Sequence, residues 1–296
     1  MLQGTRKAFQ YMECFSCKCV QIIDEPDNMN DYYNNDSYGS FAESNNHLFK
    51  KIIRRFRNAA AIRKSGGLIG RVISTIKPLP LDFTIVGEYA TPESRVLDVG
   101  CGIGSYVKDL REIGFKSATG IDPYIKADLH HADGTLIRKK YIEEVQESYD
   151  VILSHHSLEH TPKPLETLKA IKNSLVPNGI CILTIPVAED LYRRYGADCY
   201  LIQAPQHFYL FSIESIKILA KNAGFGIKTT IREIDTNLSW YINSELWKNN
   251  IATNEVHCEA SNLLPAYKVQ EIKDEIKKLK KNNKGDNIIF ILENPA

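Results

Sequence analysis

Short hydrophobic segments alternate with longer amphipathic ones along most of the chain from Glu93 onward. The short segments are rich in β-branched residues and are bounded by Gly, Pro, Asp or Asn, which is typical of buried strands. Their alternation with helical segments predicts an α/β fold with a doubly wound, mostly parallel sheet. The predicted strands are Arg95–Val99, Ala118–Ile121, Tyr149–Leu153, Ile180–Ile185, Gly226–Ile234 and Asn287–Glu293.

The predicted helices have recognisable boundaries. Ser105–Ile113 ends before Gly114, Pro164–Leu175 begins with a proline, and Ile213–Ala223 follows Ser212. Serine is favoured as an N-cap residue, proline in the first turn, and glycine just after the last helical residue. These boundary residues support helices between the predicted strands.

Residues 236–285 form an insertion before the last predicted strand. Val269, Ile272, Ile276 and Leu279 lie on one face of a Lys-rich helix in this insertion. Two interpretations remain open. The helix either packs on the edge of the sheet or forms the contact between two copies of the chain in a homodimer.

The segment before the sheet is strongly basic. Residues 46–77 contain nine Lys or Arg and no acidic residue, and Leu48, Ile52 and Phe56 form a hydrophobic stripe at helical spacing. This pattern predicts a basic helical extension over residues 46–90. Its charges either meet phosphates or another anionic surface as a lid, or form the solvated face of a helix packed on the core.

Composition and charge exclude several classes of protein. A chain of 296 residues with 43% hydrophobic and 25% charged residues can bury a sizeable core. Its 37 basic and 36 acidic residues give a net charge of +1, so we expect no nucleic-acid partner. The sequence lacks an apolar run of about 18 residues, and Arg6 and Lys7 do not suit a signal peptide. Seven mostly scattered cysteines indicate no disulfide framework, so we expect a cytoplasmic protein without a membrane span.

Residues 95–104 read Arg-Val-Leu-Asp-Val-Gly-Cys-Gly-Ile-Gly, which predicts a strand that runs into a glycine-rich turn before a helix. Such a turn lies at the carboxyl edge of a parallel sheet, where backbone approaches a nucleotide-like cofactor. Gly100, Gly102 and Gly104 do not have the dinucleotide spacing, because the third glycine comes one residue early. Asp98 lies in the strand itself, so the turn favours a different cofactor.

Two acidic residues follow at the ends of later segments. Asp122 ends the second predicted strand and precedes Pro123, where a carboxylate can accept hydrogen bonds from both hydroxyls of a ribose. Asp133 and Gly134 come next along the chain. Asp133 either accepts a hydrogen bond from an adenine amino group or forms a simple Asp-Gly turn with Gly134.

Five motifs in this order resemble those of the class I S-adenosylmethionine-dependent methyltransferases, over residues 91–234. The resemblance implies a seven-stranded Rossmann-like sheet and S-adenosylmethionine as the cofactor. It also implies that Asp122 binds the ribose of the cofactor. The motifs are Asp98–Gly104, Asp122–Pro123, Ala132–Gly134, Tyr149–His160 and Leu175–Gly179. The cofactor-binding residues that it implies are Asp98, Gly100, Gly102, Gly104, Asp122, Pro123, Asp133, Gly134 and His155.

A loop further along the chain resembles a bacterial branch of this family that acts on sugars in surface-polysaccharide or antibiotic-sugar synthesis. The loop is Leu201–Ser212, in which Gln206 stands where the branch has Arg or Glu. Residues 1–45 resemble the second half of the zinc ribbon of that branch. A structural zinc needs four ligands, whereas this chain supplies Cys14 and Cys17 with Cys19 as a spare. We therefore predict a metal-free N-terminal arm.

Methyl transfer from a sulfonium is an in-line displacement, so the acceptor must be aligned and relieved of a proton. His207 is the first candidate for the base, because sugar-modifying relatives place a catalytic histidine in the corresponding loop. His156 is the second candidate. Glu159 and His160 are interpreted as structural, since this pair opens a helix in family members of differing chemistry.

Four tyrosines flank the loop that contains His207. They either stack on a sugar and donate hydrogen bonds to its hydroxyls, or pack the loop itself. They are Tyr192, Tyr195, Tyr200 and Tyr209.

The sequence thus predicts methyl transfer from S-adenosylmethionine to a small acceptor. The leading acceptor is a sugar hydroxyl of a glycan or surface-polysaccharide precursor, linked to a nucleotide or a lipid. Two alternatives remain open. One is a quinone-like or other small phenolic acceptor, and the other is a module that binds S-adenosylmethionine without turnover.

Overall fold

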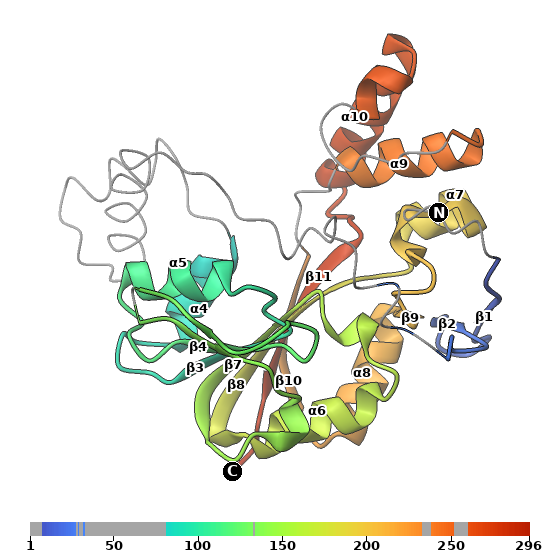
Figure 1. Ribbon diagram of the computed structural model, residues 1–296. Coiled ribbons are helices and arrows are strands. Elements are labelled where there is room, and N and C mark those ends of the chain that lie inside the picture. Colours follow the sequence, from blue (N-terminus) through green and yellow to red (C-terminus); the bar gives the residue numbers. More distant parts are fainter. Residues whose placement is uncertain are drawn as a thin grey trace.

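A computed structural model describes residues 8–27, 29, 32, 81–132, 134–232, 238–251 and 260–296 of the chain. The basic segment 46–77 and Asp133 lie outside these residues. The described part contains a large sheet between helical layers, a small N-terminal sheet, and a group of helices that projects from the sheet (Figure 1).

The large sheet has eight strands in the order β10-β11-β8-β7-β3-β4-β6-β5. The neighbouring pairs from β8 to β6 are all parallel, whereas β11 runs antiparallel to both β8 and β10, and β5 runs antiparallel to β6. The predicted doubly wound, mostly parallel Rossmann-like sheet is therefore confirmed, but it has eight strands instead of the expected seven. Its strands are β3 (Val96–Val99), β4 (Thr119–Ile121), β5 (Leu129–His130), β6 (Leu136–Arg138), β7 (Tyr149–His155), β8 (Leu175–Pro186), β10 (Gly226–Arg232) and β11 (Asn287–Glu293).

The central strands are buried on both faces. In β3, Leu97 packs in the hydrophobic cluster on one face, while Val96 packs in the cluster on the other. Ile152 and Leu153 of β7 divide in the same way. Successive side chains of a strand point to opposite faces, so a sheet covered on both sides needs continuous apolar strands. This burial explains why the strands are conspicuous in the sequence.

Helices cover the two faces of the sheet (Figure 1). The cluster on one face includes residues of α4 (Leu81–Tyr89) and α5 (Ser105–Ile113), and the cluster on the other face includes residues of α6 (Pro164–Asn173) and α8 (Ile213–Asn222). In α8 the side chain of Ser212 accepts a hydrogen bond from the backbone of Ser215, as predicted for an N-cap.

One strand begins earlier than its sequence suggests. β8 starts at Leu175 instead of Ile180, and its pairing with β7 contains a register shift. The Pro-Asn-Gly segment lies within the strand, where Asn178 adopts a φ of 61°. The segment Pro177–Gly179 therefore forms an irregularity within the strand and does not end it.

A third hydrophobic cluster unites α7 (Asp190–Tyr195), α9 (Leu238–Lys248) and α10 (Ala266–Lys281). Ile272 and Ile276 of α10 are buried in this cluster. The helix of the insertion therefore packs on other helices and not on the edge of the sheet, contrary to one of its two interpretations. Both α9 and α10 extend away from the sheet (Figure 1).

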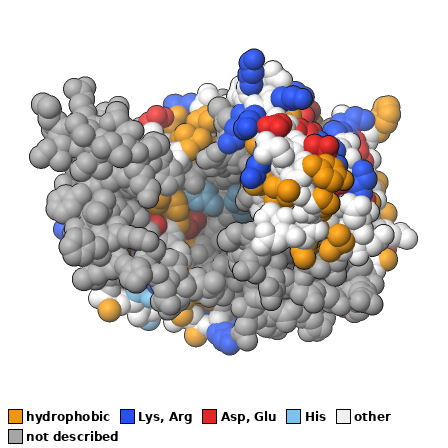
Figure 2. All heavy atoms as spheres, turned by 90° about the horizontal axis from the view of Figure 1, so that it is seen from above, with side chains coloured by type: hydrophobic (Ala, Val, Ile, Leu, Met, Phe, Trp, Pro, Cys, Tyr) orange, Lys and Arg blue, Asp and Glu red, His pale blue; other side chains and the backbone are white. Residues whose placement is uncertain are grey.

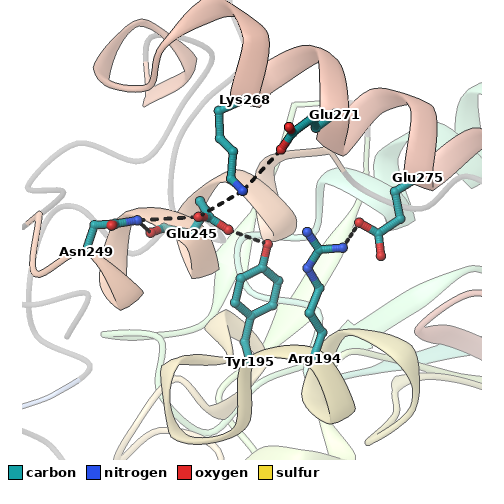
Figure 3. A network of polar contacts seen from close by, with 7 residues as sticks. All are labelled: Arg194, Tyr195, Glu245, Asn249, Lys268, Glu271 and Glu275. Atoms are coloured by element: carbon teal, nitrogen blue, oxygen red, sulfur yellow. Dashed lines mark hydrogen bonds and ion pairs between the residues drawn. The ribbon is translucent and has the colours of Figure 1, made fainter.

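A polar network joins α7, α9 and α10 (Figure 3). The hydroxyl of Tyr195 donates a hydrogen bond to Glu245, at 2.9 Å, and Lys268 Nζ lies 3.5 Å from the same carboxylate. Arg194 pairs with Glu275 beside it. Glu245 is buried and belongs to α9, so its partners on α7 and α10 connect all three helices.

The N-terminal residues form a hairpin that joins the rest of the molecule. β1 (Tyr11–Glu13) pairs with β2 (Val20–Ile22), and β2 pairs with β9 (Tyr209–Leu210) in a three-stranded antiparallel sheet. Val20 is buried in the third hydrophobic cluster. Both nitrogen–oxygen distances between Arg193 Nη1 and the Glu13 carboxylate are 2.9 Å.

Short 3-10 helices complete the described elements. Within the described ranges, the helices all lack the combination of length and hydropathy that a bilayer crossing requires. The 3-10 helices are η2 (Ile142–Glu144), η3 (Leu158–His160), η4 (Gly196–Asp198), η5 (Tyr200–Ile202) and η6 (Ala260–Leu263).

Candidate active site

The turn after β3 requires its glycines for two reasons. Gly100 and Gly104 have φ values of 75° and 79°, in the left-handed region that disfavours other residues. A Cβ atom on Gly100 would lie 2.4 Å from the Cβ of Ser157, and one on Gly104 would lie 2.3 Å from Ile137 Cδ1. The glycines therefore let β6 and the loop after β7 pack closely against the turn, which carries Gly102 between them.

Asp122 follows β4 and faces the same turn. Its Oδ2 accepts a hydrogen bond from the backbone N–H of Gly102 at 2.9 Å, and its Oδ1 accepts one from Tyr124 at 2.8 Å. Burial raises the pKa of Asp122, and the hydrogen bonds from Tyr124 and Gly102 oppose this effect. Each carboxylate oxygen has a further lone pair, so the fixed carboxylate can accept hydrogen bonds from a bound ribose.

A second carboxyl group lies within β3. Asp98 is buried, and burial followed by the charge of Asp122 raises its pKa to about 8. Two acidic groups that repel each other within one region favour a bound cation. The cofactor implied by the sequence carries a positively charged sulfonium and is therefore such a cation.

The end of β7 supplies two adjacent histidines with different surroundings. Burial, followed by the neighbouring His156, lowers the pKa of His155 to about 3, so its ring is neutral. The His155 ring packs edge-on against Tyr106, with ring centroids 4.7 Å apart, and its buried Nε2 lacks a hydrogen-bond partner among the described residues. The His156 side chain is 42% exposed, and its Nδ1 lies 3.6 Å from Oε1 of Glu159.

These elements surround a cavity of about 610 Å³ at the carboxyl edge of the sheet. Seen from above, the molecule is hollowed at this edge, and histidine side chains are visible inside the hollow (Figure 2). The predicted residues Gly100, Asp122, Pro123, His155 and His156 all line the cavity. Binding sites of doubly wound sheets lie at this edge, so the cavity is the candidate active site.

His207 lies outside the cavity, behind His160, which lines it. It is 3% exposed and is not among the residues that line the cavity. Its Nδ1 lies 2.6 Å from the backbone oxygen of Leu201, and its ring meets that of His160 edge-on with centroids 4.5 Å apart. Burial, followed by His160, lowers the pKa of His207 to about 3. The structure therefore does not bring the first candidate base to the cavity.

Gln206 beside it also points away from the cavity. Its Nε2 donates a hydrogen bond to the backbone oxygen of Tyr32 at 2.7 Å, and its side chain is buried. The glutamine thus connects the loop to the N-terminal arm.

Gly134 is also separate from the cavity. Its N–H donates to His131 in the turn that precedes β6, and an added Cβ would lie 3.1 Å from the Arg111 guanidinium. Because β6 is parallel to β4, a residue before β6 lies at the amino edge, opposite Asp122. Asp133 itself lies outside the described residues.

The four tyrosines pack the protein and do not line this cavity. Tyr195 donates to Glu245, Tyr200 lies 5.3 Å from the Trp247 ring, and Tyr209 stacks on Phe211. These contacts support the interpretation that the tyrosines pack the loop itself.

The cavity also contains residues that the sequence reasoning missed. Tyr124, Lys140 and Tyr141 line it, and the last two follow the carboxyl end of β6. The signal was weak, because β6 is three residues long. Its pattern Leu-Ile-Arg resembles an ordinary amphipathic segment.

Comparison with known proteins identifies the family. Residues 44–229, more than half of the chain, match a family described as a methyltransferase domain. The chain belongs to this methyltransferase family. S-adenosylmethionine is the methyl donor of the family, and Asp122 with its remaining lone pairs and the neighbouring carboxyl group of Asp98 fit it.

Individual relatives are similar over part of their length. The ubiquinone biosynthesis O-methyltransferase of Aliivibrio fischeri strain MJ11 is 30% identical over 145 residues, which are 44% of this chain and 62% of the relative. The tRNA U34 carboxymethyltransferase of Nautilia profundicola is 33% identical over 123 residues, 37% of this chain and 40% of the relative. The chain thus spans less than two thirds of the length of these curated relatives.

Solved methyltransferases are similar at low sequence identity. An S-adenosylmethionine-dependent methyltransferase from Mesorhizobium loti has a TM-score of 0.44 and 12% identity, covering 72% of this chain and 97% of that one. A second, from Archaeoglobus fulgidus, has a TM-score of 0.40 and 18% identity, covering 83% of this chain and 98% of that one.

Proposed function

We propose that this protein transfers a methyl group from S-adenosylmethionine to a hydroxyl group of a small acceptor. One observation carries the proposal. Asp122 and His156 line the same cavity in a chain of the methyltransferase family. The carboxylate of Asp122 can accept hydrogen bonds from a ribose, and the imidazole of His156 can accept a proton.

The cofactor-binding part of the proposal rests on groups whose orientation is fixed. Asp122 is held by two backbone N–H groups and accepts the hydrogen bonds of the ribose hydroxyls through its remaining lone pairs. Asp98 is buried beneath the turn, where its ionised form supplies negative charge to a bound cation, and Gly100 of the turn lines the cavity. When bound, S-adenosylmethionine supplies an electrophilic methyl group on a sulfonium.

His156 is the proposed proton acceptor. It is exposed to the cavity, and its Nδ1 faces the fully buried carboxylate of Glu159. An Nδ1–H directed at this carboxylate leaves Nε2 as the ring nitrogen that takes the proton of the acceptor. Glu159 is then a positioning residue whose negative charge, 3.6 Å from Nδ1, stabilises the charged ring.

The position of His207 argues against its being the general base. Its ring is buried behind His160 and is separated from the cavity, so an acceptor in the cavity does not reach it in this conformation. A general base must come within hydrogen-bond reach of the proton that it removes. This requirement favours His156 over His207.

Two acceptor classes remain in the proposal. The leading class is a sugar hydroxyl of a glycan precursor, because such a weakly acidic group needs a base like the one that His156 provides. The second class is a phenol. It is favoured by the similarity to ubiquinone biosynthesis O-methyltransferases.

The test is a turnover assay that measures S-adenosylhomocysteine with nucleotide-linked sugars, lipid-linked sugars and catechols as acceptors. With an active acceptor, His156→Ala should lower kcat by about 10²- to 10⁴-fold, the usual contribution of general acid–base catalysis. Cofactor affinity should stay within about threefold, because the ribose carboxylate is intact.

His130→Ala is the matched control, since His130 is exposed on β5. A loss of kcat in His207→Ala but not in His156→Ala would move the base to His207. Tight cofactor binding with no turnover of any acceptor class would instead support a binding module.

A further inference from the structure

Three side chains with metal-binding atoms meet at the wall of the cavity, where His160 lines it and the other two lie behind. Glu159 and His160 come from η3, and His207 comes from the loop before β9. One ligand atom from each residue lies within 4.8 Å of the others. The backbone N–H of Phe208 donates to the backbone oxygen of Glu159 at 2.9 Å, which holds the two segments together.

The carboxylate of Glu159 is the unusual member of this cluster. The side chain is 0% exposed, and neither of its oxygens has a hydrogen-bond partner among the described residues. Its contact with His156 is 3.6 Å, too long for a hydrogen bond. Burial of a carboxylate without hydrogen bonds is costly, and a bound cation removes that cost.

Both imidazoles are oriented as metal ligands are. Nδ1 of His207 lies 2.6 Å from the backbone oxygen of Leu201, and Nδ1 of His160 lies 3.0 Å from that of Gln206. A ring nitrogen so close to a carbonyl carries the proton, which leaves the lone pair on Nε2. Metal-binding histidines show this arrangement, in which the second nitrogen donates to a carbonyl and fixes the ring.

We propose that Glu159, His160 and His207 bind a divalent first-row transition metal ion, with zinc as the representative. Two imidazole nitrogens and one carboxylate suit zinc or iron(II), whereas magnesium and calcium prefer oxygen ligands. Ligand atoms around tetrahedral zinc lie about 3.4 Å apart, so the side chains approach one another by at most about 1.4 Å on binding.

The ion connects two loops that form different parts of the molecule. η3 carries His160 on the cavity wall, while His207 lies in the loop that pairs with the N-terminal hairpin. A carboxylate has two oxygens, so Glu159 binds the ion through one and faces His156 through the other. The metal site does not depend on the proposed methyl transfer, and Asp122 and Asp98 take no part in it.

The experiment must separate this site from the cysteines of the N-terminal arm. The Cys14→Ser/Cys17→Ser variant removes the two partly exposed thiols at the hairpin turn. In that background, titration of the metal-free protein with Co²⁺ should give one ion per chain. The visible absorption should be that of nitrogen and oxygen ligands, without the thiolate charge-transfer band.

Glu159→Gln and His207→Ala in the same background should each weaken Co²⁺ binding by at least about 100-fold, more than loss of a supporting hydrogen bond. Glu159→Gln preserves the shape of the buried side chain, and circular dichroism together with S-adenosylhomocysteine binding verifies its fold. His130→Ala, on the exposed face of β5, should bind Co²⁺ normally.

Two results overturn the site. One is the absence of stoichiometric Co²⁺ binding in the Cys14→Ser/Cys17→Ser background, and the other is unchanged binding in folded Glu159→Gln. Cofactor binding is read separately in the same samples. Failure of the metal site is thus distinguishable from failure of the proposed function.

Discussion

We expect the affinity for the cofactor to depend on the protonation of Asp98. Burial and the charge of Asp122 raise its pKa to about 8, so at neutral pH the free protein holds a proton that a bound cation expels. Affinity for S-adenosylmethionine should therefore rise as pH increases from 6 towards 8 and level off above that. Calorimetry in buffers of different ionisation enthalpy should show proton release on binding.

Asp98→Asn separates this effect from titration of the amino group of the cofactor. The variant should bind S-adenosylmethionine more weakly at pH 8 and lose the proton release that belongs to Asp98. Equal proton release in the variant and the wild type would assign the coupling to another group.

Asp122 carries a separate prediction about the ribose. Asp122→Ala should remove two charge-assisted hydrogen bonds and weaken S-adenosylmethionine binding by about 2 to 3 kcal/mol, or roughly 30- to 150-fold. Isothermal titration against Asp24→Ala, a change at an exposed residue, provides the comparison. A change of less than threefold would place the ribose elsewhere in the cavity.

For single residues, the sequence predicts the positions of those within contiguous motifs better than the contacts between residues far apart in the chain. Gly100, Asp122 and His156 follow strands whose boundaries are clear, and all three line the cavity. Gly134 was misplaced, because the short strand β6 comes after it and puts its turn at the opposite edge. The contact of Glu159 with His207 depends on the path of two loops, which local patterns do not encode.

The buried carboxylate of Glu245 connects the three helices α7, α9 and α10, so we expect its hydrogen bonds to contribute to stability. Tyr195→Phe removes the hydrogen bond that Tyr195 donates to Glu245 and leaves a buried oxygen with one partner fewer. We expect a loss of about 1 to 3 kcal/mol in the free energy of unfolding. Urea denaturation measures it, with Tyr267→Phe on the exposed face of α10 as the control.

An equal, small effect of the two substitutions would mean that the network of Figure 3 adds little to stability.

The sequence indicates α10 through its apolar stripe but does not indicate which elements this helix packs against. Val269 and Ile272 show that one face is buried, whereas the choice between a sheet edge, a second copy and α9 depends on tertiary packing.

At the scale of the whole molecule, the N-terminal hairpin is a part of the fold. Val20 is 1% exposed, and its strand continues the pairing of β9. Val20→Asp would bury an unpaired charge, so the hairpin should detach. Hydrogen exchange of residues 20–22 and 209–210 should accelerate at least about tenfold, since 1.4 kcal/mol corresponds to that factor.

Gln21→Asp is the matched control, because its side chain points to the opposite face of β2 and is not buried. Similar exchange in both variants would contradict the packing of Val20. From the sequence, residues 1–45 are predicted only as an N-terminal arm that resembles half of a zinc ribbon. The pairing of β2 with β9 was not visible in either segment alone, since each strand has at most three residues.

The position of β11 determines when the protein can complete its fold. This strand lies between β8 and β10, although it is made after every other described element. Until residues 287–293 leave the ribosome, β8 has one unpaired edge and β10 has no partner in the sheet. A nascent chain thus exposes strand edges that attract other chains, while the loops of the site already exist. The sheet that carries the candidate site is therefore complete only after residues 287–293 have been made.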